Sequence, residues 1–222
     1  MNRAIIIVAG GAGLRMGAEI PKQFLPLAGV PLLVRTVKAF VDFDASMKVV
    51  LVLPASFIEL WSQMAAKHLP FVHCEVVPGG AERYFSVKNG LMALEGFDGI
   101  IGIHDGVRPL VSARLIDRCY AEASRSGAVI PVIPVVDSLR EVTAEGSQHV
   151  DRSRFRAVQT PQCFQANLLR NAYEKPFSAD FTDDASVVEA DGRRVELIAG
   201  EHSNIKITTP EDLIWASTFF AS

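Results

Sequence analysis

The chain has 222 residues, 49% hydrophobic and 21% charged, which is enough to bury the core of an α/β domain and excludes a disordered or fibrous protein. Its 22 Lys and Arg against 25 Asp and Glu leave a formal net charge of −3, which excludes bulk attraction to nucleic acid or to an acidic membrane. We therefore expect one domain over residues 1–222, with any anion bound by a few locally placed cations.

The cysteines indicate a reducing compartment, and the short apolar runs indicate a soluble protein. Cys74, Cys119 and Cys163 are odd in number, far apart and never in a C-x-x-C pair, which argues against a disulfide framework or a thiolate zinc site. The apolar run 4–9 is too short for a signal peptide, and no stretch has transmembrane length. We expect a soluble, cytoplasmic protein.

Short apolar runs bounded by Gly, Pro or Asp predict buried strands in the first part of the chain. They cover residues 4–8, 48–53, 74–77, 99–103 and 128–132. Helical patterns separate them, with Ser112 as the expected N-cap of one helix. This alternation predicts a parallel sheet with helices on both faces, in which ligands bind at the carboxyl ends of the strands.

The alternation lapses over residues 135–156, where polar and apolar residues flank a turn at 144–147. This pattern predicts a β-hairpin or extended arm, either a surface flap or an element that embraces a second subunit. Beyond it we expect helices over 165–174 and 183–189, strands over 195–198 and 204–207, and a last helix capped by Thr209 with Pro210 at its first position.

The loop after the first strand is rich in glycine and carries cations. Its glycines allow tight turns and close approach of backbone N–H groups to an anion. Met16 stands where a dinucleotide fingerprint needs glycine, and no Gly-Lys-Ser or Gly-Lys-Thr forms a Walker A loop. With Arg15 in the loop and Lys22 seven residues later, the loop predicts a polyphosphate site, although such turns are also common in α/β folds without this role.

Longer motifs connect this loop with the rest of the chain. Residues 10–17 (GGAGLRMG) and 21–33 (PKQFLPLAGVPLL) resemble the opening of the sugar-phosphate nucleotidyltransferase superfamily. The later motifs are similar to those of its 2-C-methyl-D-erythritol 4-phosphate cytidylyltransferase branch, in the right order over nearly the whole chain. They are VPGGAER (77–83) with Ser86 and Val87, HDGVRP (104–109), TPQ (160–162), TDDA (182–185), and NIK (204–206) with TPED (209–212).

The resemblance implies a Rossmann-like, three-layer nucleotidyltransferase fold with a protruding β-arm. It also implies transfer of CMP from CTP to 2-C-methyl-D-erythritol 4-phosphate, which releases pyrophosphate and belongs to the non-mevalonate route to isoprenoid precursors. The implied cofactor is Mg²⁺ or another hard divalent cation on Asp105. The implied partner is a second copy of the chain, joined through the arm, whose Arg152 would act in the neighbour's site.

The resemblance also implies residue roles. Arg15 and Lys22 would be catalytic, as cations that stabilise the transition state. The nucleotide would be bound by Ala9, Gly10, Gly11, Ala12, Gly13, Gly80, Ser86, Gly106 and Lys206. The second substrate would be bound by Asp105, Arg108, Ser138, Arg152, Thr160, Thr182 and Lys206.

Two departures from the family pattern keep alternatives open. Leu14 stands where a second arginine often precedes Arg15, and Ser138 where the arm usually offers threonine, although serine keeps the hydroxyl. A ribitol 5-phosphate cytidylyltransferase, which uses the same scaffold, is the nearest alternative. A non-catalytic nucleotide-binding regulatory module is the alternative from another class, and the joint presence of Arg15, Lys22 and Asp105 argues against it.

Overall fold

The computed structural model describes residues 1–10 and 20–220 of the chain. Its strands are β1 (Arg3–Val8), β2 (Pro26–Leu27), β3 (Val30–Pro31), β4 (Lys48–Leu53), β5 (Glu75–Pro78), β6 (Ile100–Asp105), β7 (Ala128–Pro134), β8 (Leu139–Thr143), β9 (Gly146–Val150), β10 (Arg156–Val158), β11 (Gln162–Gln165) and β12 (Glu196–Ala199). Its α-helices are α1 (Leu32–Phe43), α2 (Ile58–His68), α3 (Arg83–Ala93), α4 (Ala113–Ser126), α5 (Ala166–Ala172), α6 (Asp184–Ala190) and α7 (Pro210–Ser217).

An eight-stranded sheet forms the centre of the molecule, in the order β10-β7-β11-β6-β1-β4-β5 with β12 also paired to β7. The pairs of β1 with β4 and β6, of β4 with β5, and of β7 with β12 are parallel. β11 runs antiparallel between β6 and β7, and β10 is antiparallel to β7. The mixed α/β architecture with a mostly parallel sheet, expected from the sequence, is confirmed.

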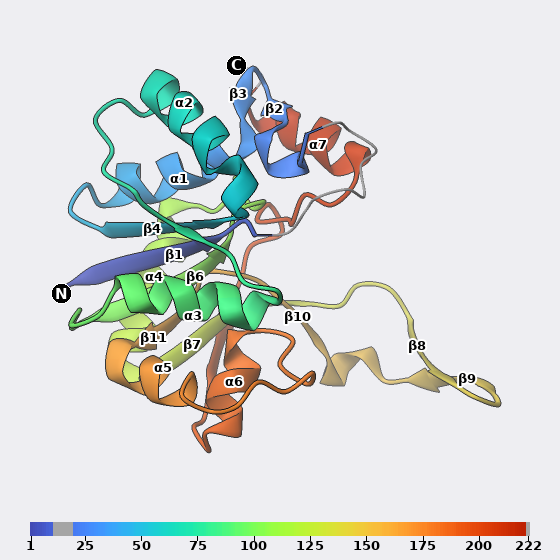
Figure 1. Cartoon of the computed structure of the whole chain (residues 1–222). Coiled ribbons are helices and arrows are strands. Elements are labelled where there is room, and N and C mark those ends of the chain that lie inside the picture. The colour runs from blue at the N-terminus through green and yellow to red at the C-terminus, as the bar shows by residue number, and fades with distance from the viewer. Residues whose placement is uncertain (11–19, 221–222) are drawn as a thin grey trace.

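Helices cover both faces of this sheet because successive side chains of a strand point to opposite sides. Ile5 and Ile7 pack with residues of α1 and α4 on one face, whereas Ala4 and Ile6 pack with α3, α5 and α6 on the other. Figure 1 shows α1 and α2 on one side of the sheet and α5 and α6 on the other. Within residues 1–10 and 20–220, no helix has the length and hydrophobicity of a membrane span.

Two predicted helix starts are confirmed by their caps. The Ser112 hydroxyl accepts a hydrogen bond from the Leu115 N–H at 3.0 Å, and the Thr209 side chain accepts one from Asp212. Pro210 is the first residue of α7, where its missing N–H costs nothing. These short polar patterns therefore fixed where α4 and α7 begin.

One prediction for the second half of the chain was wrong, and one strand there was not predicted. Residues 204–207 form no strand, because their backbone groups make hydrogen bonds to the loop after β6. The Ile207 N–H donates to the Val107 carbonyl, and the Arg108 side chain donates to the Asn204 carbonyl. The helix expected over 165–174 is confirmed as α5, but the short antiparallel strand β11 that precedes it was not predicted. Only long-range pairing with β6 and β7 makes residues 162–165 a strand.

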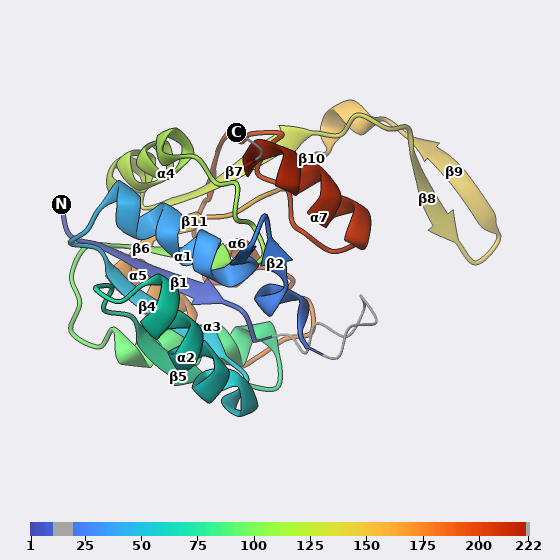
Figure 2. The same cartoon turned by 90° about the horizontal axis from the view of Figure 1, so that it is seen from above.

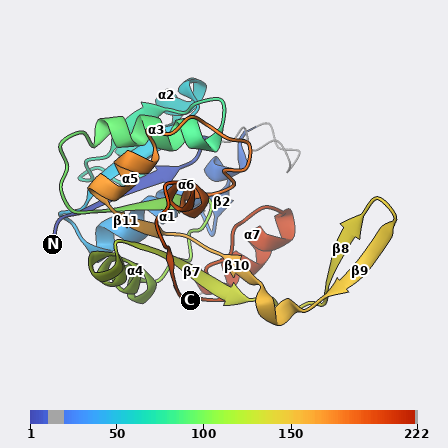
Figure 3. The same ribbon diagram turned by 90° about the horizontal axis from the view of Figure 1, so that it is seen from below.

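The β8–β9 hairpin lies apart from the body. The two strands pair antiparallel with each other, and most of their residues are exposed. Figures 1, 2 and 3 show the hairpin extending beyond the side of the molecule toward which β1 runs. The sequence prediction of an extended arm within residues 135–156 agrees with this arrangement.

Candidate active site

The register of the sheet brings the predicted site residues to one edge. Val8, the last residue of β1, lies beside Val52 of β4 and Asp105 of β6, while Leu53 lies beside Pro78 of β5. The segments that follow these strands carry Ala9, Gly10, Gly79, Gly80 and Gly106. Motifs separated by up to about a hundred residues therefore meet at the carboxyl edge, where ligands of parallel sheets bind.

Close backbone approach explains the glycines at this edge. A Cβ on Gly80 would lie 2.3 Å from the Phe85 Cβ, and one on Gly106 would lie 2.9 Å from the Ala9 Cβ. A Cβ on Gly10 would lie 3.2 Å from the Ser86 hydroxyl, which accepts the Gly80 N–H at 3.1 Å. Gly10, Gly80 and Ser86 thus come together from three segments of the chain, and glycine at positions 10 and 80 permits this close packing.

Asp105 is the charged centre of the edge. Its Oδ2 accepts the Arg108 Nε–H at 3.1 Å and lies 3.2 Å from the Lys206 ammonium. Burial by itself would raise the pKa of the carboxyl, but Lys206, Arg83 and Arg108 outweigh it and hold that pKa well below its usual range. The carboxylate is therefore ionised at every pH at which the protein is expected to work.

A fixed hydrogen-bond chain holds the backbone on either side of Asp105. His104 Nε2 bonds the Arg108 carbonyl at 3.1 Å and so carries the proton, which leaves Nδ1 to accept the Thr160 hydroxyl at 2.9 Å. The Thr160 oxygen in turn accepts the Asp105 N–H at 3.1 Å. Burial lowers the pKa of His104 to about 4, so the ring is neutral. The Thr160 hydroxyl is thus already bonded on both sides.

Lys22 joins the same region from the first motif. It opens the 3-10 turn Lys22–Phe24, and its ammonium donates to the Ile207 carbonyl at 3.0 Å. Ile207 directly follows Lys206, so two predicted cations lie in neighbouring segments although 184 residues separate them in sequence. The neighbouring side chain of Gln23 donates to the Ala9 carbonyl at 3.0 Å, which fixes this turn to the end of β1.

The remaining predicted residues lie elsewhere. Ser138 and Arg152 are exposed at the base of the hairpin, where Arg152 donates to the Val136 carbonyl. Thr182 is exposed just before α6. Gly11, Ala12, Gly13 and Arg15 lie outside the described residues. One chain therefore brings together most, but not all, of the predicted site.

Residues that the sequence did not single out support the edge. The Asn204 side chain donates to the Thr160 carbonyl at 2.8 Å. Arg83 and Asp184 form a bidentate ion pair with N–O distances of 2.8 and 2.6 Å. Both belong to quoted motifs, but only the fold brings them together.

The described residues contain no cluster of three or more His, Cys, Asp or Glu that could hold a metal by protein ligands alone. They do offer one carboxylate: both cations meet Oδ2 of Asp105, and its Oδ1 has no partner among the described hydrogen bonds. Mg²⁺ is commonly bound by one or two carboxylates together with substrate phosphates. This donor set fits such an ion.

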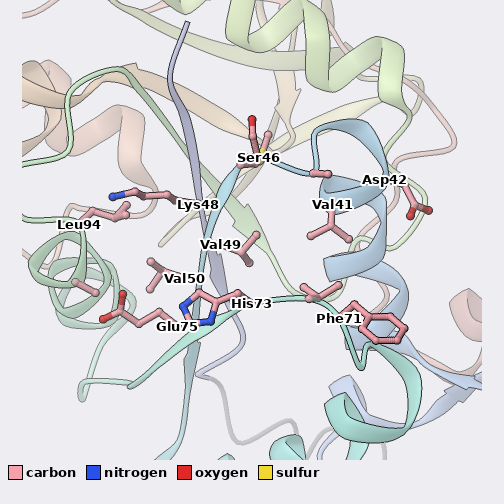
Figure 4. Close-up of a pocket in the computed structure, with 14 residues that line it drawn as sticks. Val41, Asp42, Ser46, Lys48, Val49, Val50, Phe71, His73, Glu75 and Leu94 are labelled. Atoms are coloured by element: carbon pink, nitrogen blue, oxygen red, sulfur yellow. The ribbon is translucent and has the colours of Figure 1, made fainter.

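A cavity of about 590 Å³ lies at the opposite end of the sheet, beside the first residues of β4 and β5. Figure 4 shows Lys48, His73 and Glu75 among the side chains that line it. None of the predicted site residues lines this cavity. Its size alone therefore does not make it the active site.

Comparisons with known proteins agree with the geometry. The family model described as IspD, 2-C-methyl-D-erythritol 4-phosphate cytidylyltransferase, matches residues 3–222. Proteins of that name from Bacteroides fragilis and Phocaeicola vulgatus are 52% and 51% identical to the chain, over 98% and 96% of it and 99% and 97% of their own lengths. The crystal structure of the Thermus thermophilus protein of that name is similar with a TM-score of 0.79 and 36% identity, covering 99% of this chain and 98% of that one.

Proposed function

The chain belongs to the 2-C-methyl-D-erythritol 4-phosphate cytidylyltransferase family, and we propose that the carboxyl edge around Asp105 is where it carries out the reaction of that family. The enzyme transfers CMP from CTP to 2-C-methyl-D-erythritol 4-phosphate, gives the CDP-alcohol and pyrophosphate, and serves isoprenoid biosynthesis. The single observation that carries the proposed location is the convergence of Asp105, Lys206, Lys22 and the Gly80–Ser86 turn at one edge.

The chemistry needs alignment and positive charge more than a base. A phosphate monoester has a second pKa near 6, so the attacking oxygen is already ionised at pH 7. The enzyme must bring this anion to the α-phosphorus of CTP and stabilise the charge that develops on the leaving pyrophosphate. The neutral, fully bonded His104 agrees with a mechanism that uses no histidine base.

Lys22 and Arg15 supply that positive charge in our proposal. The bond to the Ile207 carbonyl holds the Lys22 ammonium beside the segment that carries Lys206. Nucleotide contacts are assigned to the backbone of Ala9, Gly10, Gly80 and Gly106, to Ser86 and Lys206, and to the loop residues Gly11, Ala12 and Gly13.

Asp105 is the proposed ligand of Mg²⁺ or another hard divalent cation. When bound, the cation would neutralise part of the triphosphate charge. Lys206 and Arg108 keep the carboxylate ionised and fix its orientation through Oδ2. Asp105 thus offers an ionised carboxylate in a fixed orientation beside the proposed nucleotide contacts.

The second substrate would be bound by Arg108, Lys206 and Thr182, with Thr160 acting through its bond to the Asp105 backbone. Ser138 and Arg152 would join this site from the arm of a second copy, so we propose a homodimer in which each site uses both chains. The exposure of both residues, away from the Asp105 edge of their own chain, supports this assignment. The three free cysteines suit a reducing cytoplasm, the proposed compartment.

The test is pyrophosphate release with CTP, ATP, GTP and UTP, each with 2-C-methyl-D-erythritol 4-phosphate and with ribitol 5-phosphate. We expect CTP with the methylerythritol phosphate to be the reactive pair. Faster release with ribitol phosphate would reassign the second substrate, and no release with any pair would contradict an enzymatic role.

A further inference from the structure

Arg83 and Asp184 form a partly buried ion pair that the mechanism above does not use. Arg83 is the first residue of α3 and Asp184 the first residue of α6. The two guanidinium nitrogens donate to the two carboxylate oxygens at 2.8 and 2.6 Å, and the Tyr173 hydroxyl donates to Asp184 at 2.7 Å. The Asp184 side chain is completely buried, whereas that of Arg83 is 29% exposed.

Such a pair fixes geometry rather than adding much net stability. An ion pair taken out of water loses so much hydration that its net contribution to stability is often small, whereas removal of one partner leaves an uncompensated buried charge. Burial opposes the charge of Arg83, but Asp184 outweighs it and raises the pKa of the guanidinium. The guanidinium therefore stays charged, and its planar fork on the two carboxylate oxygens allows only a narrow range of relative positions of α3 and α6.

The pair connects the two halves of the proposed site. Gly80, assigned to the nucleotide, precedes Arg83 by three residues, and its N–H donates to the Ser86 hydroxyl of α3. Thr182, assigned to the second substrate, precedes Asp184 by two residues. The Gln162 side chain accepts the N–H groups of Asp184 and Ala185 at 3.0 Å, which ties the start of α6 to β11.

We propose that the Arg83–Asp184 pair is a positioning element that sets the separation of the nucleotide half from the second-substrate half of the active site. Neither side chain contacts a reacting atom. The positive charge of Arg83 also acts on Asp105 and helps to lower its pKa, which places the pair in the electrostatic surroundings of the site. The assignment rests on the proposed locations of the two substrates.

The expected consequence is a loss of rate rather than of binding. Each half keeps its own contacts when the link is loosened, but the reacting atoms no longer align. A misplacement of about 1 Å can cost about 10²-fold in rate. The signature of positioning is therefore a lower kcat with nearly unchanged KM values.

The experiment compares Arg83→Lys and Asp184→Asn with wild type in the pyrophosphate-release assay with CTP and 2-C-methyl-D-erythritol 4-phosphate. Lysine keeps the charge but loses the bidentate fork, and asparagine keeps the size and can still accept from Tyr173. We expect kcat to fall by about 10- to 100-fold in both variants, with each KM within about threefold of wild type. The stoichiometry of CTP binding by calorimetry measures the folded fraction of each preparation.

The chain offers a matched control in Arg3→Lys. Arg3 pairs with Asp44 at 2.9 Å, and the two side chains are 25% and 16% exposed. This pair lies where β1 begins, at the amino end of the sheet. The same chemical change should leave kcat within about twofold of wild type, because it alters no link between the substrate halves.

Three outcomes contradict the proposal. A wild-type kcat in Arg83→Lys that binds CTP with full stoichiometry overturns it. A higher KM for one substrate at unchanged kcat overturns it as well, since the pair would then serve binding. If wild type releases no pyrophosphate from this pair of substrates, the proposed function fails and the positioning role with it; an active wild type with an unimpaired variant removes the positioning role alone.

Discussion

The two ends of the central sheet differ in how their charged side chains are arranged. At the carboxyl end, Asp105 is bonded to Arg108 and Lys206, and glycines allow the loops beside it to pack closely. At the amino end lies the cavity of about 590 Å³, lined by charged and apolar side chains such as Lys48 and Glu75 (Figure 4). In the part of the chain that the structure describes, no ion pair joins two of these lining residues.

Convergence of charged groups, rather than the volume of a cavity, therefore identifies the site. Charged groups at the carboxyl end come from distant segments and hold one another in fixed positions, which a charge-stabilising site requires. The cavity at the amino end is large, but in the described residues its lining side chains form no ion pairs with one another. If this comparison is right, substitutions at the first end should change catalysis and equivalent substitutions at the second should not.

The largest effect is expected for Lys22→Ala. Loss of one donor to the developing charge typically lowers kcat by about 10²- to 10³-fold. The matched change at the other end is Lys48→Ala, which removes an ammonium from the first residue of β4. Steady-state kinetics with CTP should show the large loss only for Lys22→Ala; equal rates for the two variants would remove Lys22 from the mechanism.

The arm carries Arg152, which we propose acts in the active site of a second subunit. If Arg152 acts in the neighbour's site, a mixed dimer of Arg152→Ala and Lys22→Ala chains contains one intact site and one doubly altered site. Statistical exchange at equal concentrations should then restore about one quarter of the wild-type activity, because half of the dimers are mixed. Size-exclusion chromatography with light scattering checks that dimers form. Mixtures that stay as inactive as their components would place Arg152 in the site of its own chain.

The buried histidine at the carboxyl end predicts a pH dependence of stability. The pKa of His104 is about 4 in the folded chain against an ordinary value of 6.5, so the unfolded chain binds a proton between these values that the folded chain does not. The free energy of unfolding therefore decreases as the pH falls from about 6.5 to about 4, by about 2 kcal/mol between pH 7 and pH 4.5.

Urea unfolding of wild type and His104→Gln at these two pH values measures this contribution. The variant should lose less stability on acidification, by about 2 kcal/mol. His73→Gln, which changes a histidine at the amino-end cavity, is the control for substitution itself. An identical pH-dependent loss in wild type and His104→Gln would show that His104 is not buried in its neutral form.

The sequence predicted what depends on local pattern. Apolar runs located β1, β4, β5, β6 and β7 to within a few residues, and Ser112 and Thr209 located two helix starts. Asp105 could be placed at a ligand-binding edge because it follows an apolar run. Its role, however, came from the resemblance of the motifs and not from the pattern of residues.

What failed depends on long-range contacts. The strand β11 is short and polar at both ends, and only its neighbours β6 and β7 make it a strand. Residues 204–207 resemble a strand in composition, but their backbone is used to hold Arg108 and Lys22. The Arg83–Asp184 pair joins positions 101 residues apart, and no local pattern could reveal it.

The location of the active site is tested by two isosteric changes at opposite ends of the sheet, Asp105→Asn and Glu75→Gln, compared by kcat in the same pyrophosphate-release assay. Asp105 ends β6 and Glu75 begins β5, so each change removes one carboxylate charge. We predict a loss on the order of 10²-fold for Asp105→Asn and a change within about twofold for Glu75→Gln. Equal activity of the two variants, or a larger loss in Glu75→Gln, would contradict the assignment of the active site to the carboxyl edge.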